Sequence, residues 1–234
     1  MKRIGLFVPS SNTTMEPEIY RALPPQVTLH VARLFLTKIE PGSIEAILKD
    51  LDSQARNLAS ADVDVLVLGA TAPSFLKGLG YDKSVIERIE AACGKRATTT
   101  TTALVQALQP LDISRFVLAT AYDDEVNAIA TAFFRQSGFD VLDAQGLNVV
   151  DNLKVGRLPA STAIELVRKV DRPDAQAIVL SCTNWKSMEI IEQLEQELKK
   201  PVLSTTQVSL WAALRMIGEF QSIEGYGRLL RQLA

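Results

Sequence analysis

The sequence has very little of the side chains that most metal sites and nucleophilic triads need. Its 234 residues include one histidine, His30, and two cysteines, Cys93 and Cys182. Zinc sites need several Cys or His ligands at set spacings, so we predict none. A catalytic triad would have to use His30, which lies in the strand-like segment VTLHVARL and is more typical of a packed side chain. Two thiols and no recognisable export signal indicate a cytoplasmic protein with reduced cysteines.

Strong charge and long apolar runs are also missing. The net charge is -2 and the basic residues are scattered, so we expect no nucleic-acid partner. No uncharged stretch approaches the length of a membrane span, and we expect no membrane partner. No glycine-rich phosphate-binding motif follows a strand-like segment, so we expect no nucleotide cofactor. A homo-oligomer is left open.

What the chain does have is a regular alternation of strand-like and helical segments. The helical segments, in which apolar residues recur at spacings of three and four, are 43–61, 123–138, 185–200 and 207–218. The strand-like segments are 3–9, 27–34, 63–70, 96–100, 115–120, 139–145, 175–182 and 201–206. This alternation predicts an α/β fold with mainly parallel sheets flanked by helices.

The two halves of the chain resemble each other at a constant offset. VLVLGAT at 65–71 aligns with AIVLSCT at 177–183, and 4–6 aligns with 116–118, each pair 112 residues apart. A repeat at half the chain length predicts two βα lobes related by a pseudo-two-fold axis, with a cleft between them.

The predicted lobes are residues 1–112 and 113–234. We expect the C-terminal segment of the second lobe to pack back on the first.

The ends of four predicted strands supply the candidate site. In open parallel sheets, ligands bind outside the carboxyl ends of the strands, where backbone N–H groups point at them. The same polar side chains are also ordinary helix N-caps, so each has a structural alternative. The candidates at these ends are Ser10, Asn12, Ala70, Thr71, Ala72, Tyr122, Cys182, Thr183 and Asn184.

A thiol at a strand end suits proton transfer to or from carbon. Hydroxyls and N–H groups around it could hold a carboxylate as it becomes an enediolate. We expect the helix predicted from Trp185 onward to lower the pKa of the Cys182 thiol. The position that matches Cys182 in the repeat is Ala70, so a symmetric mechanism with two thiols is excluded.

Four motifs carry a resemblance to a known family through nearly the whole chain. VPSSNTTMEPE at 8–18, ATAYDDEVN at 119–127, LSCTN at 180–184 and GYGRLL at 225–230 resemble the aspartate/glutamate racemase superfamily. Within it, they are most similar to the branch that contains arylmalonate decarboxylase and maleate cis-trans isomerase.

The resemblance to the decarboxylase implies an enzyme without a cofactor. One carboxylate of the substrate leaves from an apolar pocket, and a single cysteine then protonates the enediolate. The matching residues are Thr71, Tyr122, Cys182 and the Thr183 backbone N–H for the enediolate, and Leu36, Ile39 and Ile44 for the apolar wall. Ala72 departs from the pattern, because the decarboxylase has a serine there.

The resemblance to maleate isomerases implies different roles for some positions. Asn12, Tyr122 and Asn152 match the groups that bind the two carboxylates in those enzymes, but the nucleophilic cysteine falls at Ala70. Asn152 in turn falls where the decarboxylase has an apolar residue, and a polar amide there would oppose the desolvation that favours loss of CO2.

We therefore predict a Cys182-dependent enzyme acting on a small dicarboxylate or substituted malonate, with decarboxylation ranked first. Cis-trans isomerisation ranks second and racemisation third. A non-catalytic carboxylate-binding protein is the alternative from another class.

Overall fold

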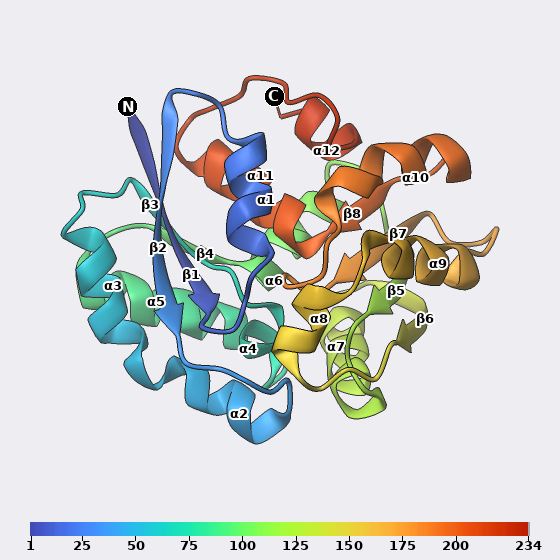
Figure 1. The fold of residues 1–234 in the computed structure, drawn as a ribbon, viewed down its shortest axis with the longest axis horizontal. Helices are drawn as coiled ribbons and strands as arrows, with labels where there is room; N and C mark the ends of the chain where they lie inside the picture. Colours follow the sequence, from blue (N-terminus) through green and yellow to red (C-terminus); the bar gives the residue numbers. More distant parts are fainter. Residues whose placement is uncertain (234) are drawn as a thin grey trace.

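The computed structural model describes residues 1–233, without the side chain of Glu45, and shows the predicted alternation of strands and helices. Figure 1 shows two sheets side by side, each with helices packed around it. The elements of the first half are β1 (Lys2–Pro9), α1 (Met15–Ala22), β2 (Val27–Leu34), α2 (Pro41–Ala46), the 3-10 helix η1 (Ile47–Asp50), α3 (Leu51–Ala59), β3 (Val65–Leu68), α4 (Thr71–Phe75), α5 (Tyr81–Cys93), β4 (Ala97–Thr99) and α6 (Thr100–Leu108).

The second half repeats this order with different helix lengths. Its elements are β5 (Arg115–Thr120), α7 (Asp124–Gln136), β6 (Asp140–Gly146), α8 (Asn152–Arg157), α9 (Ala160–Val170), β7 (Ala177–Ser181), the 3-10 helix η2 (Met188–Ile190), α10 (Ile191–Leu198), β8 (Val202–Ser204), α11 (Thr205–Met216) and α12 (Arg228–Arg231).

The sheets confirm the predicted fold class and the repeat. Both contain four parallel strands, in the orders β2-β1-β3-β4 and β6-β5-β7-β8. Ile4 pairs with Val65 in the first sheet, and Phe116 pairs with Ala177 in the second, so the offset of 112 residues holds on both strands. The matching strand ends therefore occupy equivalent places in the two sheets.

The inner strands are buried on both faces, as expected for parallel sheets covered by helices. All residues of the inner strands β3 and β7 are buried, and so are those of the edge strand β8. The helices α6 and α11 pack against each other between the two sheets, and a hydrogen bond of 2.9 Å joins the hydroxyls of Thr100 and Ser209. One continuous cluster of buried apolar side chains includes residues of both halves.

Two predicted helices have different limits in the structure. The segment 43–61 is divided into α2, η1 and α3. The predicted start of the helix 185–200 was wrong, because the chain after Cys182 forms a turn and becomes helical only at Met188. The turn is closed by the Trp185 N–H, which donates to the Cys182 carbonyl at 3.1 Å.

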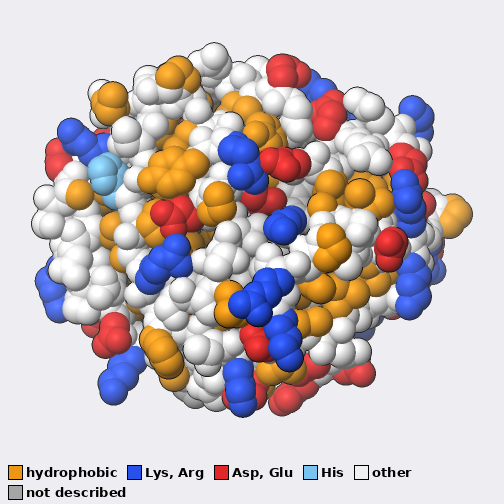
Figure 2. All heavy atoms as spheres, viewed as in Figure 1, with side chains coloured by type: hydrophobic (Ala, Val, Ile, Leu, Met, Phe, Trp, Pro, Cys, Tyr) orange, Lys and Arg blue, Asp and Glu red, His pale blue; other side chains and the backbone are white. Residues whose placement is uncertain are grey.

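The C-terminal segment is anchored in the core by its leucines. Leu229, Leu230 and Leu233 are buried in the shared core, and α12 packs on α11. Figure 2 shows acidic and basic side chains intermixed over one face of the molecule. Among the helices of residues 1–233, none is long and apolar enough to cross a membrane.

Candidate active site

A small cavity lies where the ends of β1, β3, β5 and β7 come together. Its volume, counted as the space open to the centre of a water molecule, is about 30 Å³. The lining residues are Pro9, Leu36, Ile39, Ile44, Ala70, Thr71, Ala72, Pro73, Tyr122, Asn152, Cys182 and Thr183. The structure thus brings together most of the candidates predicted from the strand ends and from the family resemblance.

One wall of the cavity is apolar. Leu36, Ile39 and Ile44 follow β2 and are each at most 5% exposed. This segment is held in place by backbone hydrogen bonds with the chain before α8: the Ile39 N–H donates to the Val150 carbonyl at 2.8 Å. The wall would desolvate a carboxylate that is placed against it.

Cys182 lies in this cavity as a protonated thiol. The residue is 6% exposed, and burial raises the pKa of the thiol to about 12, although the N–H groups of Asn184 and Trp185 act in the opposite direction. The expected lowering of the pKa was therefore wrong. No helix begins directly after Cys182, so two N–H groups of a turn have to act against the desolvation.

Tyr122 and Thr71 supply two hydroxyl groups close to the thiol. Burial, followed by the neighbouring Cys182, raises the pKa of the Tyr122 phenol well above its usual range, so the phenol is a hydrogen-bond donor at neutral pH. The Thr71 hydroxyl is buried and makes no hydrogen bond of normal length to the described residues, although it lies close enough to the Tyr122 phenol to act on the pKa of that group. A buried hydroxyl without a partner indicates that a ligand atom or water completes the site. Together the two groups could bind a carboxylate oxygen.

Asn152 is a polar member of the lining. It is the first residue of α8 and is 2% exposed, and its Nδ2 donates to the Ser11 hydroxyl at 2.8 Å. The amide is thus oriented by the first-half loop that follows β1.

Three predicted substrate-binding residues do not line the cavity, because their side chains bind other parts of the protein. Ser10 bonds to the backbone of Leu36. The Asn12 Oδ1 accepts from the backbone N–H groups of Thr14 and Met15, each at 3.0 Å, at the start of α1. Asn12 therefore caps the start of α1, which is the structural role that the sequence also allowed for these polar residues.

Asn184 is the third, and it joins the two halves of the chain. Its Oδ1 accepts from the Thr13 N–H at 2.8 Å, and its Nδ2 donates to the Asn152 and Ser11 carbonyls at 2.6 and 3.4 Å. Thr183, which does line the cavity, also uses its hydroxyl internally, donating to the Gly69 carbonyl at 3.1 Å.

The sequence did not lead us to Glu18, a buried carboxylate that bonds to the segment following Cys182, at Ser187 and Met188. It lies on α1 with Met15, Ile19 and Ala22, at the spacing of an apolar helix face. A charged residue on such a face was the signal that could have found it.

His30 and Tyr226 do not line the cavity, and the described residues contain no metal-binding group. Within residues 1–233, no group of three or more His, Cys, Asp or Glu side chains could hold a metal ion. His30 contacts the Thr28 hydroxyl on β2, at 3.1 Å. Tyr226 is outside the cavity lining, and its backbone carbonyl accepts from Gln207 Nε2 at 2.6 Å.

Comparison with known proteins agrees with this fold and with the family resemblance. The family model described as arylmalonate decarboxylase matches residues 4–230, and the chain therefore belongs to this family of enzymes. The chain is 29% identical to a maleate isomerase of Pseudomonas putida, covering 97% of this chain and 96% of the relative. It is also 29% identical to an arylmalonate decarboxylase of Bordetella bronchiseptica, covering 97% and 95%.

Solved structures of both kinds of enzyme are similar to this one. A cysteine-to-serine mutant of the Nocardia farcinica maleate cis-trans isomerase, which carries a covalently bound succinylcysteine intermediate, has a TM-score of 0.94 and 27% identity, covering 98% of each chain. A liganded double mutant of arylmalonate decarboxylase, changed at one glycine and one cysteine, has a TM-score of 0.92 and 27% identity, also covering 98% of each chain.

Proposed function

We propose that this protein decarboxylates a substituted malonate without a cofactor, and that Cys182 protonates the product. The observation that carries the proposal is the number and state of the thiols in the cavity. Of the described residues that line it, only Cys182 carries sulfur, and the matched position holds Ala70. Burial keeps this thiol protonated, which suits an acid better than a nucleophile.

The proposed reaction uses one face of the substrate. One carboxylate lies against the apolar wall of Leu36, Ile39 and Ile44, which destabilises its charge. The carbon–carbon bond breaks, CO2 leaves, and the electron pair passes to the remaining carboxylate, forming an enediolate. The Thr71 and Tyr122 hydroxyls donate hydrogen bonds to its oxygens.

The second step returns a proton to carbon. The electron pair of the enediolate forms a bond to the Cys182 proton at the α-carbon, leaving a thiolate. The thiolate then takes a proton from water, which restores the starting enzyme. Because Cys182 delivers its proton from one side, a malonate with two different substituents on the α-carbon should give a single enantiomer.

Maleate isomerisation is the second candidate, and Asn152 favours it. Its amide lies in the cavity lining, where it could bind a second carboxylate. The similarity to maleate isomerases is as strong as the similarity to the decarboxylase. Against it stand Ala70 at the position of the nucleophile and Asn12, whose side chain caps α1 and bonds to Thr183.

Proton NMR in D2O tests these candidates directly. We expect phenylmalonate to lose CO2 and to gain one deuterium at the α-carbon with the parent protein, and to stay unchanged with Cys182→Ser. Cys93→Ser is the matched control and should retain full activity, since Cys93 is on α5 and outside the cavity lining. Conversion of maleate to fumarate, with no reaction of phenylmalonate, would replace the first proposal by the second. If phenylmalonate, maleate and aspartate all remain unchanged, the better explanation of the cavity is that the protein binds carboxylates without catalysis.

The remaining expectations concern partners and location. We propose a small dicarboxylate as the only ligand class of this cavity. A nucleic-acid partner stays unexpected because of the scattered basic residues, and a membrane partner because of the lack of a long uncharged stretch; the cytoplasmic location stays a prediction from the sequence.

A further inference from the structure

Glu18 is a buried carboxylate of the first half that bonds to the backbone of the second. It is 2% exposed, and its Oε1 accepts from the N–H groups of Ser187 and Met188 at 2.8 and 3.1 Å. These N–H groups open η2, the first helical turn after Cys182. The carboxylate therefore caps a helical turn 170 residues away in the chain.

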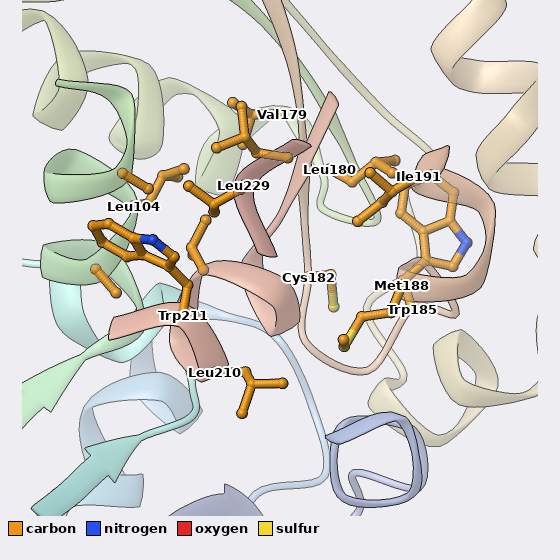
Figure 3. Close-up of a cluster of buried hydrophobic side chains, with 14 of the residues drawn as sticks. Leu104, Val179, Leu180, Cys182, Trp185, Met188, Ile191, Leu210, Trp211 and Leu229 are labelled. Carbon is orange, nitrogen blue, oxygen red and sulfur yellow. The ribbon is translucent and has the colours of Figure 1, made fainter. Parts of the chain in front are cut away.

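The segment between Cys182 and Ser187 is short and is held at both ends by first-half groups. Asn184 binds to Thr13 and Ser11 near its start, and Glu18 binds to Ser187 and Met188 at its end. Figure 3 shows Cys182 near Met188, and both belong with Trp185 to one cluster of buried side chains. Only four residues lie between the thiol and Ser187, so a shift of the Glu18 end would be transmitted to the thiol.

Glu18 also lines a second cavity, of about 290 Å³, between α1 and the segment 186–190. Three buried polar atoms of its lining have no hydrogen-bond partner among the described residues: Thr14 Oγ1, Glu18 Oε2 and Ser187 Oγ. The free Glu18 oxygen leaves the carboxylate able to exchange a proton at this cavity, without breaking its bonds to the loop.

Charged groups on several elements face this carboxylate. Arg21 of α1 is paired with Glu189 of η2 at 2.6 Å, and Lys186 lies in the lining of the same cavity. The Tyr226 phenol of the C-terminal segment also lies within electrostatic range. Burial dominates over the two N–H groups and Arg21, and it raises the pKa of Glu18 to about 7. The carboxyl group therefore changes its charge near neutral pH.

We propose that Glu18 is a positioning residue for the Cys182 thiol, acting through the backbone N–H groups of Ser187 and Met188. This inference rests on the proposed function where its test measures kcat on phenylmalonate, whereas the hydrogen-exchange test is independent of it. An ionised carboxylate makes stronger hydrogen bonds than a neutral carboxyl group. The loop should accordingly be held best above pH 7, and more loosely below it.

Three variants test the proposal: Glu18→Gln, Glu18→Ala and, as a matched control, Glu125→Gln on the exposed face of α7. In Glu18→Ala we expect kcat on phenylmalonate to fall about ten- to a hundredfold with little change in KM, since a displaced catalytic group affects the chemical step. In Glu18→Gln, which keeps an acceptor oxygen, most activity should return. The parent and the control Glu125→Gln should show a several-fold rise of kcat as the pH passes 7. Glu18→Gln should not show this rise, because its amide does not ionise.

Amide hydrogen exchange at Ser187 and Met188 is the second readout and does not depend on turnover. Both amides should exchange at least tenfold faster in Glu18→Ala than in the parent. If the parent does not react with phenylmalonate, the proposed function fails, while faster exchange would still support the role of Glu18. Unchanged exchange, or a rise of kcat near pH 7 that persists in Glu18→Gln, would overturn the inference. If Glu18→Ala does not fold, the pH profile of Glu18→Gln decides.

Discussion

At the scale of single residues, the cavity works by controlling which groups carry charge. Cys182 and Tyr122 are both protonated because burial disfavours their ionised forms. A neutral thiol beside two hydroxyl donors is suited to deliver a proton to an enediolate. The same environment would slow a mechanism that needs a thiolate in the resting enzyme.

The raised pKa of Cys182 leads to a prediction about its reactivity. Iodoacetamide should label Cys182 at pH 8 at least tenfold more slowly in the folded protein than in the protein unfolded by urea, because alkylation requires the thiolate. The rate in the folded protein should keep rising up to about pH 11. Mass spectrometry of peptic peptides measures both rates. Rapid labelling of the folded protein at pH 7 would show that the thiol is ionised.

Glu18 leads to a prediction about stability and pH. Its pKa rises from 4.5 to about 7 on folding, because the desolvation of the ionised form outweighs its stronger hydrogen bonds to Ser187 and Met188. Its net contribution to stability is therefore complete below pH 4.5 and is lost as the pH rises through 7, although the two local hydrogen bonds are stronger above pH 7. The full effect corresponds to about 3 kcal/mol. Relative to the parent, Glu18→Gln should therefore gain about 2 to 3 kcal/mol between pH 5 and pH 8.5.

Urea unfolding of both proteins at these two pH values measures that gain. Glu125→Gln serves as the control and should follow the parent at both. A difference between Glu18→Gln and the parent that is the same at pH 5 and pH 8.5 would contradict the assignment.

At the scale of elements, α8 shows how closely the two halves approach. Gly156 lies on this helix, and a Cβ atom there would collide with the Thr13 hydroxyl and come within 3.0 Å of the Asn184 side chain. The absence of a side chain thus lets α8 pack on the two loops that Asn184 joins.

Two glycine substitutions test this contact. Gly156→Ala should lower the free energy of unfolding by about 1 to 3 kcal/mol, because the Thr13 side chain, and to a smaller extent that of Asn184, has to move. Gly42→Ala is the matched control on helix α2, where a Cβ would meet nothing within 4 Å, and it should be neutral or stabilising by up to about 1 kcal/mol. Urea unfolding followed by circular dichroism measures both. Equal effects of the two substitutions would argue against a close packing at α8.

At the scale of the whole molecule, the buried apolar side chains do not divide between the two halves of the repeat, although a second, smaller cluster, from Phe7 to Ala97, lies within the first half alone. One cluster of buried side chains extends from Ile4 in β1 to Leu233 near the C-terminus. Buried hydrogen bonds such as that from Asn12 to Thr183 also cross between the halves. The larger cluster is therefore a core that both halves share, and each half contributes apolar side chains to it.

We consequently expect the two predicted lobes to unfold together. Both tryptophans, Trp185 and Trp211, are in the second half, so their fluorescence reports on that half and on its contact with α6, while far-ultraviolet circular dichroism reports on all helices. The two signals should give the same midpoint in urea, as for a two-state transition. Separate midpoints would show that residues 1–112 and 113–234 are independent folding units.

The sequence by itself determined the strands, the repeat and the strand ends that meet at the cavity. Hydrophobic periodicity and an offset of 112 residues are local properties of the chain, and parallel pairing then brings matched strand ends together. The apolar wall and Asn152 were reached through the family resemblance. All of these depend on residue type and order.

Only the tertiary structure decided how the polar side chains are used. Asn12 and Asn184 are of a type that binds substrates, yet their partners in the fold are Thr183 and Thr13, each 171 residues away. The direction of the Cys182 pKa shift was mispredicted for the same reason. Desolvation depends on everything packed around a group, and hydrogen-bond partners far along the chain cannot be read from its neighbours in sequence.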